Sequence, residues 1–250
     1  KFDTEGNCLD MANVPPHQDF KHKVHAKAYK TAEQNGLIWV FMGDQANVPA
    51  LPPIEVTLVP FGERRTTFCQ RDCNWLQALE GDIDTSHNGI LHLGKVDTAM
   101  FIEGETNIHA VANRMPEYDA TETDTGAMYV AYRPADGDPD TTYWRLGQFL
   151  FPFWTMAPIT PLTGNVLAFA NVPIDDTHTM CISMIKNDAY PSDRDTMHKR
   201  MPGASISFPY IPNTSDWNGR WRVDQNMAND YKIDREVQRT LSYTGVEGVP

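Results

Sequence analysis

The residues with the clearest chemical potential lie in one stretch, NWLQALEGDIDTSHNGILH, residues 74–92. It holds one glutamate, two aspartates and two histidines among mostly apolar residues. On a helix, five polar side chains of this stretch fall within less than half of the circumference, beside an apolar arc. These five are Asn74, Gln77, Glu80, Asp84 and His87. Because no Lys or Arg lies between Arg71 and Lys95, we expect the acids to find their partners elsewhere in the fold.

The spacing of the two histidines raises the question of a shared metal ion. In a regular α-helix His87 and His92 would be rotated apart by about 140°, so they could bind one ion only if the helix were distorted. Gly89 is a natural place for a break or a π-bulge. Two imidazoles with a carboxylate describe the iron(II) centre of non-haem oxygenases, and zinc accepts the same ligands. Hydrogen-bonded polar groups on a buried helix fit the spacing equally, so the spacing leaves these interpretations open.

Composition narrows the class of protein. The 250 residues are 41% hydrophobic, which is enough for one large core or for a core with a smaller module. A formal net charge of -12 and the lack of a basic run argue against nucleic-acid binding. The longest apolar stretch, residues 149–159, is too short and too often interrupted by proline to span a membrane. Four cysteines without a C-x-x-C pair favour a reducing cytoplasm.

The elements that must position these residues predict an α+β fold. Residues 1–43 are predicted as short strands, and the prolines of residues 44–56 predict an extended connector. We therefore expect one domain over residues 1–45 and a second over residues 46–250. A helix is predicted over residues 71–93, strands over 106–115, 126–134, 143–153, 165–173 and 178–187, and a helix-prone segment over 222–241. Closely spaced strands with few helices between them favour an antiparallel sheet.

Three further groups of residues could contribute to a site. In QFLFPFWTM, strand alternation would put three aromatic rings on one face, either as the wall of a pocket for a ring-shaped substrate or as core packing: Phe149, Phe151 and Phe153. Three arginines could clamp a substrate carboxylate, although such arginines are more often solvated: Arg114, Arg133 and Arg145. The segment DDTH, residues 175–178, is predicted as a turn with side-chain capping.

The opening stretch also resembles a known motif. The pattern N-x-x-Q-x-x-E-G-x-x-D-x-x-H-x-x-x-x-H resembles the mononuclear-iron motif of the Rieske non-haem iron oxygenases, in the branch of phthalate 4,5-dioxygenase-like α subunits. Four more segments are similar to that family: KFDTEGNCLDM, GLIWVFMG, VPIDDTHTM and NDYKIDREVQRT. The resemblance implies that residues 1–45 are the C-terminal part of a Rieske [2Fe-2S] domain. Residues 46–250 would then form a helix-grip catalytic domain, an antiparallel sheet around a long helix.

The same resemblance implies roles for individual residues. His87 and His92 would be iron ligands. Asp84 would be a bridging carboxylate that hydrogen-bonds a cluster histidine on the neighbouring subunit and gives electrons a short route to the iron. The amides of Asn74 and Gln77 would orient Asp84 or solvent near the metal.

The family's remaining ligands are expected outside the chain. Its cluster ligands would precede Lys1, and its third iron ligand, an aspartate, would follow Pro250, so we expect a fragment that is inactive alone. The intact protein is expected to use Fe(II), a Rieske cluster, O2 and NADH through a ferredoxin or reductase, and to form a homotrimer or hexamer. The expected reaction is dioxygenation, monooxygenation or O-demethylation of an aromatic substrate, carboxylated in the case of phthalate-like acids. The alternatives are a helix-grip module that binds apolar ligands without a metal, and a zinc hydrolase.

Overall fold

The computed structural model describes residues 1–92, 98–100, 106–157, 166–186, 210–214, 220–240 and 245. Of His92 and Met100 it describes the backbone only. The chain divides into two compact units, Lys1–Pro53 and Ile54–Pro250, so the division lies within the proline-containing connector. The assignment of the first unit to a Rieske domain stays a prediction.

The first unit is built from turns and one hairpin. Strand β1 (Thr31–Gln34) pairs antiparallel with β2 (Leu37–Val40) around the turn residues Asn35 and Gly36. Both turn residues have positive φ, 60° and 71°, which suits the right-handed twist of a two-residue hairpin. Two 3-10 turns precede the hairpin, at Pro16–Gln18 and Lys21–Lys23.

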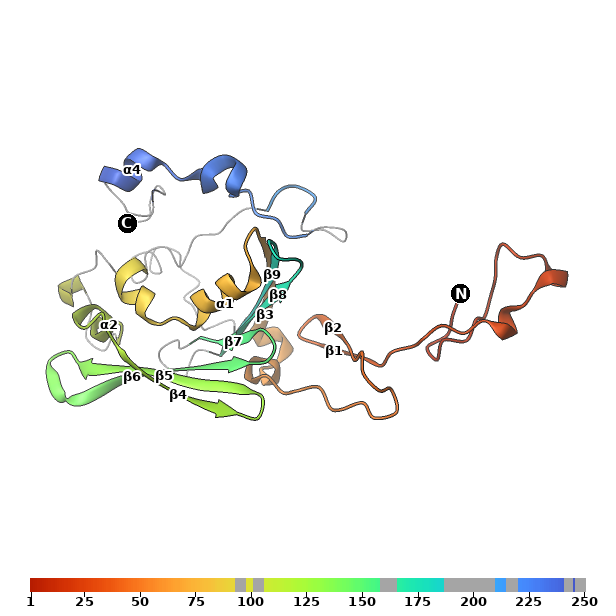
Figure 1. Cartoon of the computed structure of the whole chain (residues 1–250), viewed down its shortest axis with the longest axis horizontal. Helices are drawn as coiled ribbons and strands as arrows, with labels where there is room; N and C mark the ends of the chain where they lie inside the picture. Colours follow the sequence, from red (N-terminus) through yellow and green to blue (C-terminus); the bar gives the residue numbers. More distant parts are fainter. Residues whose placement is uncertain are drawn as a thin grey trace. The chain divides into compact units, whose positions relative to one another are not determined.

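A seven-stranded sheet is the framework of the second unit (Figure 1). Its strand order is β3-β9-β8-β7-β6-β5-β4, and every neighbouring pair is antiparallel, which confirms the predicted sheet type. The strands are β3 Arg64–Arg71, β4 Glu117–Thr123, β5 Gly126–Ala135, β6 Asp138–Leu150, β7 Trp154–Met156, β8 Leu167–Pro173 and β9 Thr179–Lys186. Strands β5, β8 and β9 coincide with predicted ones within the described residues.

Two helices lie on one side of this sheet (Figure 1). Helix α1 (Trp75–Ile83) packs against β7 and β8, and α2 (Ile108–Ala112) packs against β5. The other helical segments are the 3-10 turns Glu55–Leu58, Phe61–Glu63, Thr98–Met100 and Met227–Lys232, the π-helix Asn88–His92 and helix α4 Arg235–Thr240. None of the described helices has the length and hydrophobicity needed to cross a membrane.

Strand β8 is buried on both faces. Asn171 faces α1 and is 1% exposed, whereas Ala168 and Ala170 alternate to the other face and are 0% exposed. The turn Glu55–Leu58 packs against β8, and its Val56 is also fully buried. This double burial explains why the sequence of β8 is almost continuously apolar.

The predicted helix over residues 71–93 is wrong in its extent. Arg71 still belongs to β3, where it pairs with Thr179 of β9. Helix α1 is bounded by Asn74 and Asp84, which both have extended backbone angles. The helical period of the side chains was correct for the middle of the stretch but carried no information about these two breaks.

Two predicted strands also differ from the structure. Residues 106–115 contain α2 instead, because a short apolar run fits either element and its packing on residues 88–92 and on β5 favours the helix. The strand predicted over residues 143–153 ends at Leu150, and residues 151–153 form a turn with a cis Phe151–Pro152 peptide bond. Phe151 is therefore 68% exposed, and the expected row of three inward-facing aromatic rings does not form.

Candidate metal centre

Asn74 holds the start of α1. Its Oδ1 accepts a hydrogen bond from the Leu76 N–H at 2.9 Å, as an N-cap residue does, and its Nδ2 donates to the Asp176 carbonyl at 3.0 Å. The second bond ties the helix to the β8–β9 turn. Gln77 donates to Glu80 Oε2 at 3.3 Å. These contacts lie at the start of the helix and along its surface, and none of them reaches Asp84.

Asp84 ends α1 and begins a second helical stretch. Its Oδ1 accepts from the N–H and the hydroxyl of Ser86, at 2.8 and 2.7 Å, and its Oδ2 accepts from the His87 N–H at 3.2 Å. An aspartate in this position satisfies the free N–H groups of a helix start. Partial burial raises the pKa of Asp84, but these hydrogen bonds outweigh it and the net pKa is lowered.

The same carboxylate orients the first predicted ligand, His87. Asp84 Oδ2 lies 3.3 Å from His87 Nδ1, and both side chains are partly exposed. When Nδ1 carries its proton toward the carboxylate, the lone pair of a neutral imidazole is on Nε2. A carboxylate behind a histidine ligand fixes the tautomer in this way and raises the basicity of the ligand. If His87 binds a metal in this tautomer, it does so through Nε2.

The distortion predicted near Gly89 is confirmed, because residues Asn88–His92 form a π-helix. Its i→i+5 pattern brings residues five apart onto the same side, which a regular α-helix does not do for His87 and His92. Gly89 packs directly on α2, since a Cβ atom there would lie 2.7 Å from the Ala110 carbonyl oxygen. Arg114 donates to the Gly89 carbonyl at 2.8 Å.

A tyrosine that the sequence analysis missed completes the surroundings of Asp84. The Tyr118 hydroxyl of β4 lies 3.4 Å from Asp84 Oδ1 and 3.2 Å from Thr85 Oγ1. Tyr118 is 49% exposed, so this group of side chains reaches the protein surface. Tyr118 lies on a strand that no motif singled out, and its sequence alone carried no signal for the contact.

Asp82 of α1 has its hydrogen-bond partners on strands β7 and β8. It accepts from Asn171 Nδ2 at 2.7 Å and lies 3.5 Å from Thr155 Oγ1, and both of these residues are almost completely buried. Burial raises the pKa of Asp82, and the Asn171 hydrogen bond and the positive Arg71 oppose that rise only in part. The expectation that these acids are balanced by distant residues is confirmed for Asp82, which anchors α1 to β7 and β8.

Two of the three candidate arginines are buried under the helices. Arg133 of β5 is 2% exposed and Arg145 of β6 is 7% exposed. Arg133 Nη1 donates to the Asn113 carbonyl at 2.6 Å, while its Nε and Nη2 have no hydrogen-bond partner within the part of the chain that is described. Burial lowers the pKa of both guanidinium groups, and the positive charge of Arg145 lowers that of Arg133 further.

Two tyrosine hydroxyls are buried on the same two strands. Tyr129 of β5 and Tyr143 of β6 have no partner for the hydroxyl oxygen among the described residues. Burial raises the pKa of Tyr129 strongly, and the nearby Arg145 lowers it in part. Tyr129 lies over Gly147, where a Cβ atom would come within 2.3 Å of its ring. Buried donors of this kind usually have a partner, so this face of the sheet has unused hydrogen-bonding capacity.

Of the two histidines predicted as ligands, the structure describes the side chain of His87. Among the described side chains, no group of three His, Cys, Asp or Glu residues is arranged to hold a metal. The side chain of His92 lies outside that description, and the third ligand was expected after Pro250. What is described fits a metal site, since the Asp84 carboxylate lies behind the His87 imidazole and the backbone of Asn88–His92 departs from α-helical geometry.

Comparison with known proteins identifies the family. Residues 40–250 match the family described as "LigXa C-terminal domain like". The chain belongs to this LigXa C-terminal-like family. The oxygenase subunit of 3-chlorobenzoate-3,4-dioxygenase from Comamonas testosteroni is 39% identical over 254 residues, covering 100% of this chain and 58% of the relative. The oxygenase subunit of phthalate 4,5-dioxygenase from Pseudomonas putida is 28% identical over 257 residues, covering 100% and 56%.

These relatives confirm the resemblance of this LigXa C-terminal-like chain to Rieske oxygenase α subunits. A solved structure of dicamba monooxygenase bound to dicamba superposes with a TM-score of 0.51 at 14% identity, over 79% of this chain and 60% of that one. At such low identity the match speaks for the fold alone, and it confirms the α+β class. The chain spans less than two thirds of each of these proteins.

Proposed function

We propose that this chain carries the mononuclear-iron part of an oxygenase that hydroxylates aromatic carboxylates with O2. The single observation that supports this most is the Asp84–His87 turn continued by the π-helix Asn88–His92, found in a chain of this family. His87 and His92 would hold the iron together with a carboxylate as third ligand. The iron, when bound, would supply the activation of O2.

Other residues of the chain would orient the histidine ligand, position α1 and bind the substrate. Asp84 would keep His87 in the tautomer that binds a metal. Asp82 would hold α1 on the sheet through its hydrogen bond with Asn171. This would fix the distance between the sheet and the Asp84–His87 turn that follows α1. The buried tyrosine hydroxyls of β5 and β6 would face the substrate and take up its polar groups.

Asp84 is also suited to the bridging role. Its side chain is 39% exposed and stays charged, because hydrogen bonds from Ser86 and His87 lower its pKa. We therefore propose that it accepts a hydrogen bond from a Rieske-cluster histidine of a neighbouring subunit. That role requires a ring-shaped homotrimer or its dimer, with electrons delivered from NADH by a ferredoxin or reductase.

The buried arginines favour a carboxylated substrate. A buried guanidinium with unsatisfied N–H groups is costly, and Arg133 is 2% exposed with its Nε and Nη2 unpartnered among the described residues. A carboxylate can bind such a group through two parallel hydrogen bonds. The names of the two relatives contain 3-chlorobenzoate and phthalate, which are both aromatic acids. Dioxygenation, monooxygenation and O-demethylation would use the same residues.

The test uses the oxygenase that carries this chain, with its electron donor and labelled O2. We expect label in the hydroxylated product of a benzoate-type acid. Arg133→Met should raise the KM at least tenfold, while Arg65→Met, at an exposed position of β3, should change nothing. A metal-free binding module would instead bind neutral aromatic compounds better than their acids, and removal of iron would leave that binding intact. That result would exclude the proposal.

A further inference from the structure

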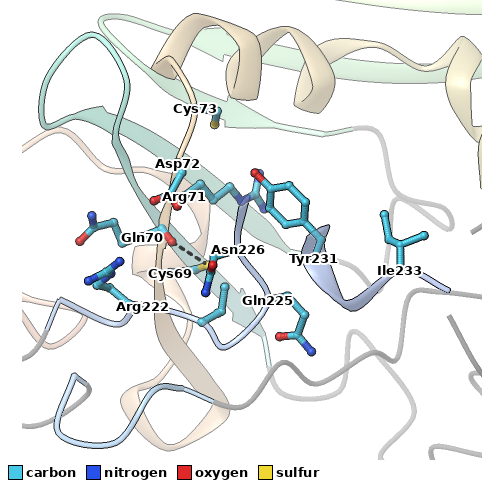
Figure 2. Close-up of a pocket in the computed structure, with 11 residues that line it drawn as sticks. Cys69, Gln70, Arg71, Asp72, Cys73, Arg222, Gln225, Asn226, Tyr231 and Ile233 are labelled. Atoms are coloured by element: carbon cyan, nitrogen blue, oxygen red, sulfur yellow. Dashed lines mark hydrogen bonds between the residues drawn. The ribbon is translucent and has the colours of Figure 1, made fainter. Parts of the chain in front are cut away.

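The second unit contains a cavity of about 440 Å³ at the edge strand β3 (Figure 2). Its wall comes from residues 69–73, at the end of β3, and from residues 222–233. The volume lies in the range of small-molecule sites. None of the residues discussed for the metal centre lines this cavity, apart from Arg71, which acts on Asp82 through its charge.

The cavity lies at the opposite end of α1 from the Asp84–His87 turn. Cys73 lines it, and α1 begins two residues later at Trp75. The nine residues of α1 span roughly 13 Å, and the turn follows the far end. A ligand in this cavity would therefore not contact His87.

The segment that contains residues 222–233, the second wall of the cavity, is attached to β3 by specific contacts. The Gln70 N–H donates to the Trp221 carbonyl at 2.9 Å, and Gln70 and Arg222 form a parallel bridge. The rings of Phe68 and Trp221 stack with their centroids 4.6 Å apart. Tyr210 adds a hydrogen bond from its hydroxyl to the Phe68 carbonyl. These contacts hold the start of the 222–233 segment against β3.

A cation and an aromatic ring point toward one another inside it. In Figure 2, Arg71 extends from β3 toward Tyr231, whose ring enters from the opposite wall. Tyr231 lies within three consecutive residues of positive φ, Asp230 to Lys232, which L-residues adopt only at a cost. The Tyr231 N–H donates to the Asn226 carbonyl at 2.9 Å and helps to hold this backbone. Such backbone occurs preferentially at ligand sites.

The remaining wall selects an apolar body with one negative end. Val223 and Ile233 offer apolar surface, and of the charged lining residues Arg71, Asp72 and Arg222 it is Arg71 whose guanidinium extends toward Tyr231 (Figure 2). A guanidinium binds a carboxylate well, and an exposed tyrosine ring stacks on another ring. We propose that this cavity is a second binding site for a small aromatic carboxylate, separate from the metal centre. The choice of an aromatic acid rests on the proposed function, because substrate and product would both be of this class.

The experiment counts bound benzoate by equilibrium dialysis against radiolabelled benzoate, in the oxygenase that carries this chain. We expect two molecules per chain in the wild type, and one after Arg71→Met. Val223→Phe, which fills the cavity without touching the charge, should also leave one. Arg222→Met is the matched control, since its guanidinium lies beside Gln70 and points away from Tyr231 (Figure 2), and it should leave two. Circular dichroism of each variant checks that the fold is retained.

The two proposals fail in different ways. If Arg71→Met and Val223→Phe leave the number of bound molecules unchanged, the second site is excluded while the proposed function stands. If Arg133→Met leaves it unchanged and Arg71→Met lowers it, the substrate site at Arg133 is excluded while the second site stands. Equal loss with Arg71→Met and Arg222→Met would mean attraction by net charge, and this would also overturn the second site.

Discussion

At the scale of single residues, Asp84 combines two tasks that are usually separate. Its oxygens cap the helical stretch that begins at Ser86, and one of them also orients the imidazole of His87. A cap fixes where a helix starts, so the same carboxylate sets the backbone position of His87 and lies against its ring. The D-x-x-H spacing follows from this geometry, because the third residue after an N-cap is the one whose N–H the cap reaches.

Replacing Asp84 should separate the two tasks. Asn caps a helix about as well as Asp, so Asp84→Asn should change the free energy of unfolding by less than about 0.5 kcal/mol. Loss of the carboxylate behind His87 should lower the Fe(II) affinity roughly 10–100-fold. Competition with a chelator under anaerobic conditions, in the oxygenase that carries this chain, measures the affinity. Glu80→Gln, on the exposed face of α1, is the control and should leave both quantities unchanged. An unchanged affinity in Asp84→Asn would contradict the orienting role.

Burial of Asp82 predicts a pH effect on stability. Its pKa is higher in the folded chain than the ordinary 3.8, so the folded state binds the proton more tightly than the unfolded state. The wild type should therefore lose stability relative to Asp82→Asn as the pH rises from below 3.8 through the folded-state pKa. Urea unfolding of both proteins between pH 3.5 and pH 7 gives the difference. Parallel pH profiles would mean that the pKa of Asp82 is not raised.

At the scale of elements, the stretch after α1 departs from α-helical geometry between His87 and His92, the two residues proposed to bind iron. The π-helix Asn88–His92 packs on α2, and Gly89 permits this contact because it has no Cβ atom. Arg114 fastens the two elements through the Gly89 carbonyl. A π-helix is uncommon and is often found at functional sites, and here its cost is met by packing against a neighbouring helix.

Two glycine substitutions test this packing. Gly89→Ala should destabilise the fold by about 1–3 kcal/mol, because the added Cβ would meet the Ala110 carbonyl oxygen at 2.7 Å. Gly81→Ala has open space around it within α1 and should stabilise by about 0.5–1 kcal/mol. Urea unfolding measures both. A stabilised Gly89→Ala would show that the contact between the π-helix and α2 is not close.

At the scale of the whole molecule, the core belongs to one unit. Every buried apolar residue of the described chain lies at Ile54 or later, whereas residues 1–53 contain one two-stranded hairpin. The first unit also leaves large apolar side chains exposed, among them Ile38 and Met42. An isolated hairpin is only marginally stable in water, so the two units must differ greatly in stability.

Expressing the units separately tests this difference. Residues 54–250 alone should keep the β-sheet signal in circular dichroism and unfold cooperatively in urea, because the core is internal to them. Residues 1–53 alone should show no cooperative transition. If residues 54–250 fail to fold while the whole chain does fold, the first unit supplies part of the core.

The sequence by itself determined the features that depend on neighbouring residues. Short apolar strands with few helices between them predicted an antiparallel sheet, and the spacing of His87 and His92 predicted a distortion near Gly89 if the two share an ion, which is where the π-helix lies. Only the tertiary structure decided which distant groups meet: Asn171 and Thr155 with Asp82, and Tyr118 with Asp84. It also decided that residues 106–115 contain a helix and that Phe151 faces solvent. Periodicity is a property of a contiguous segment, whereas contacts between segments depend on strand order and register, which no local pattern encodes.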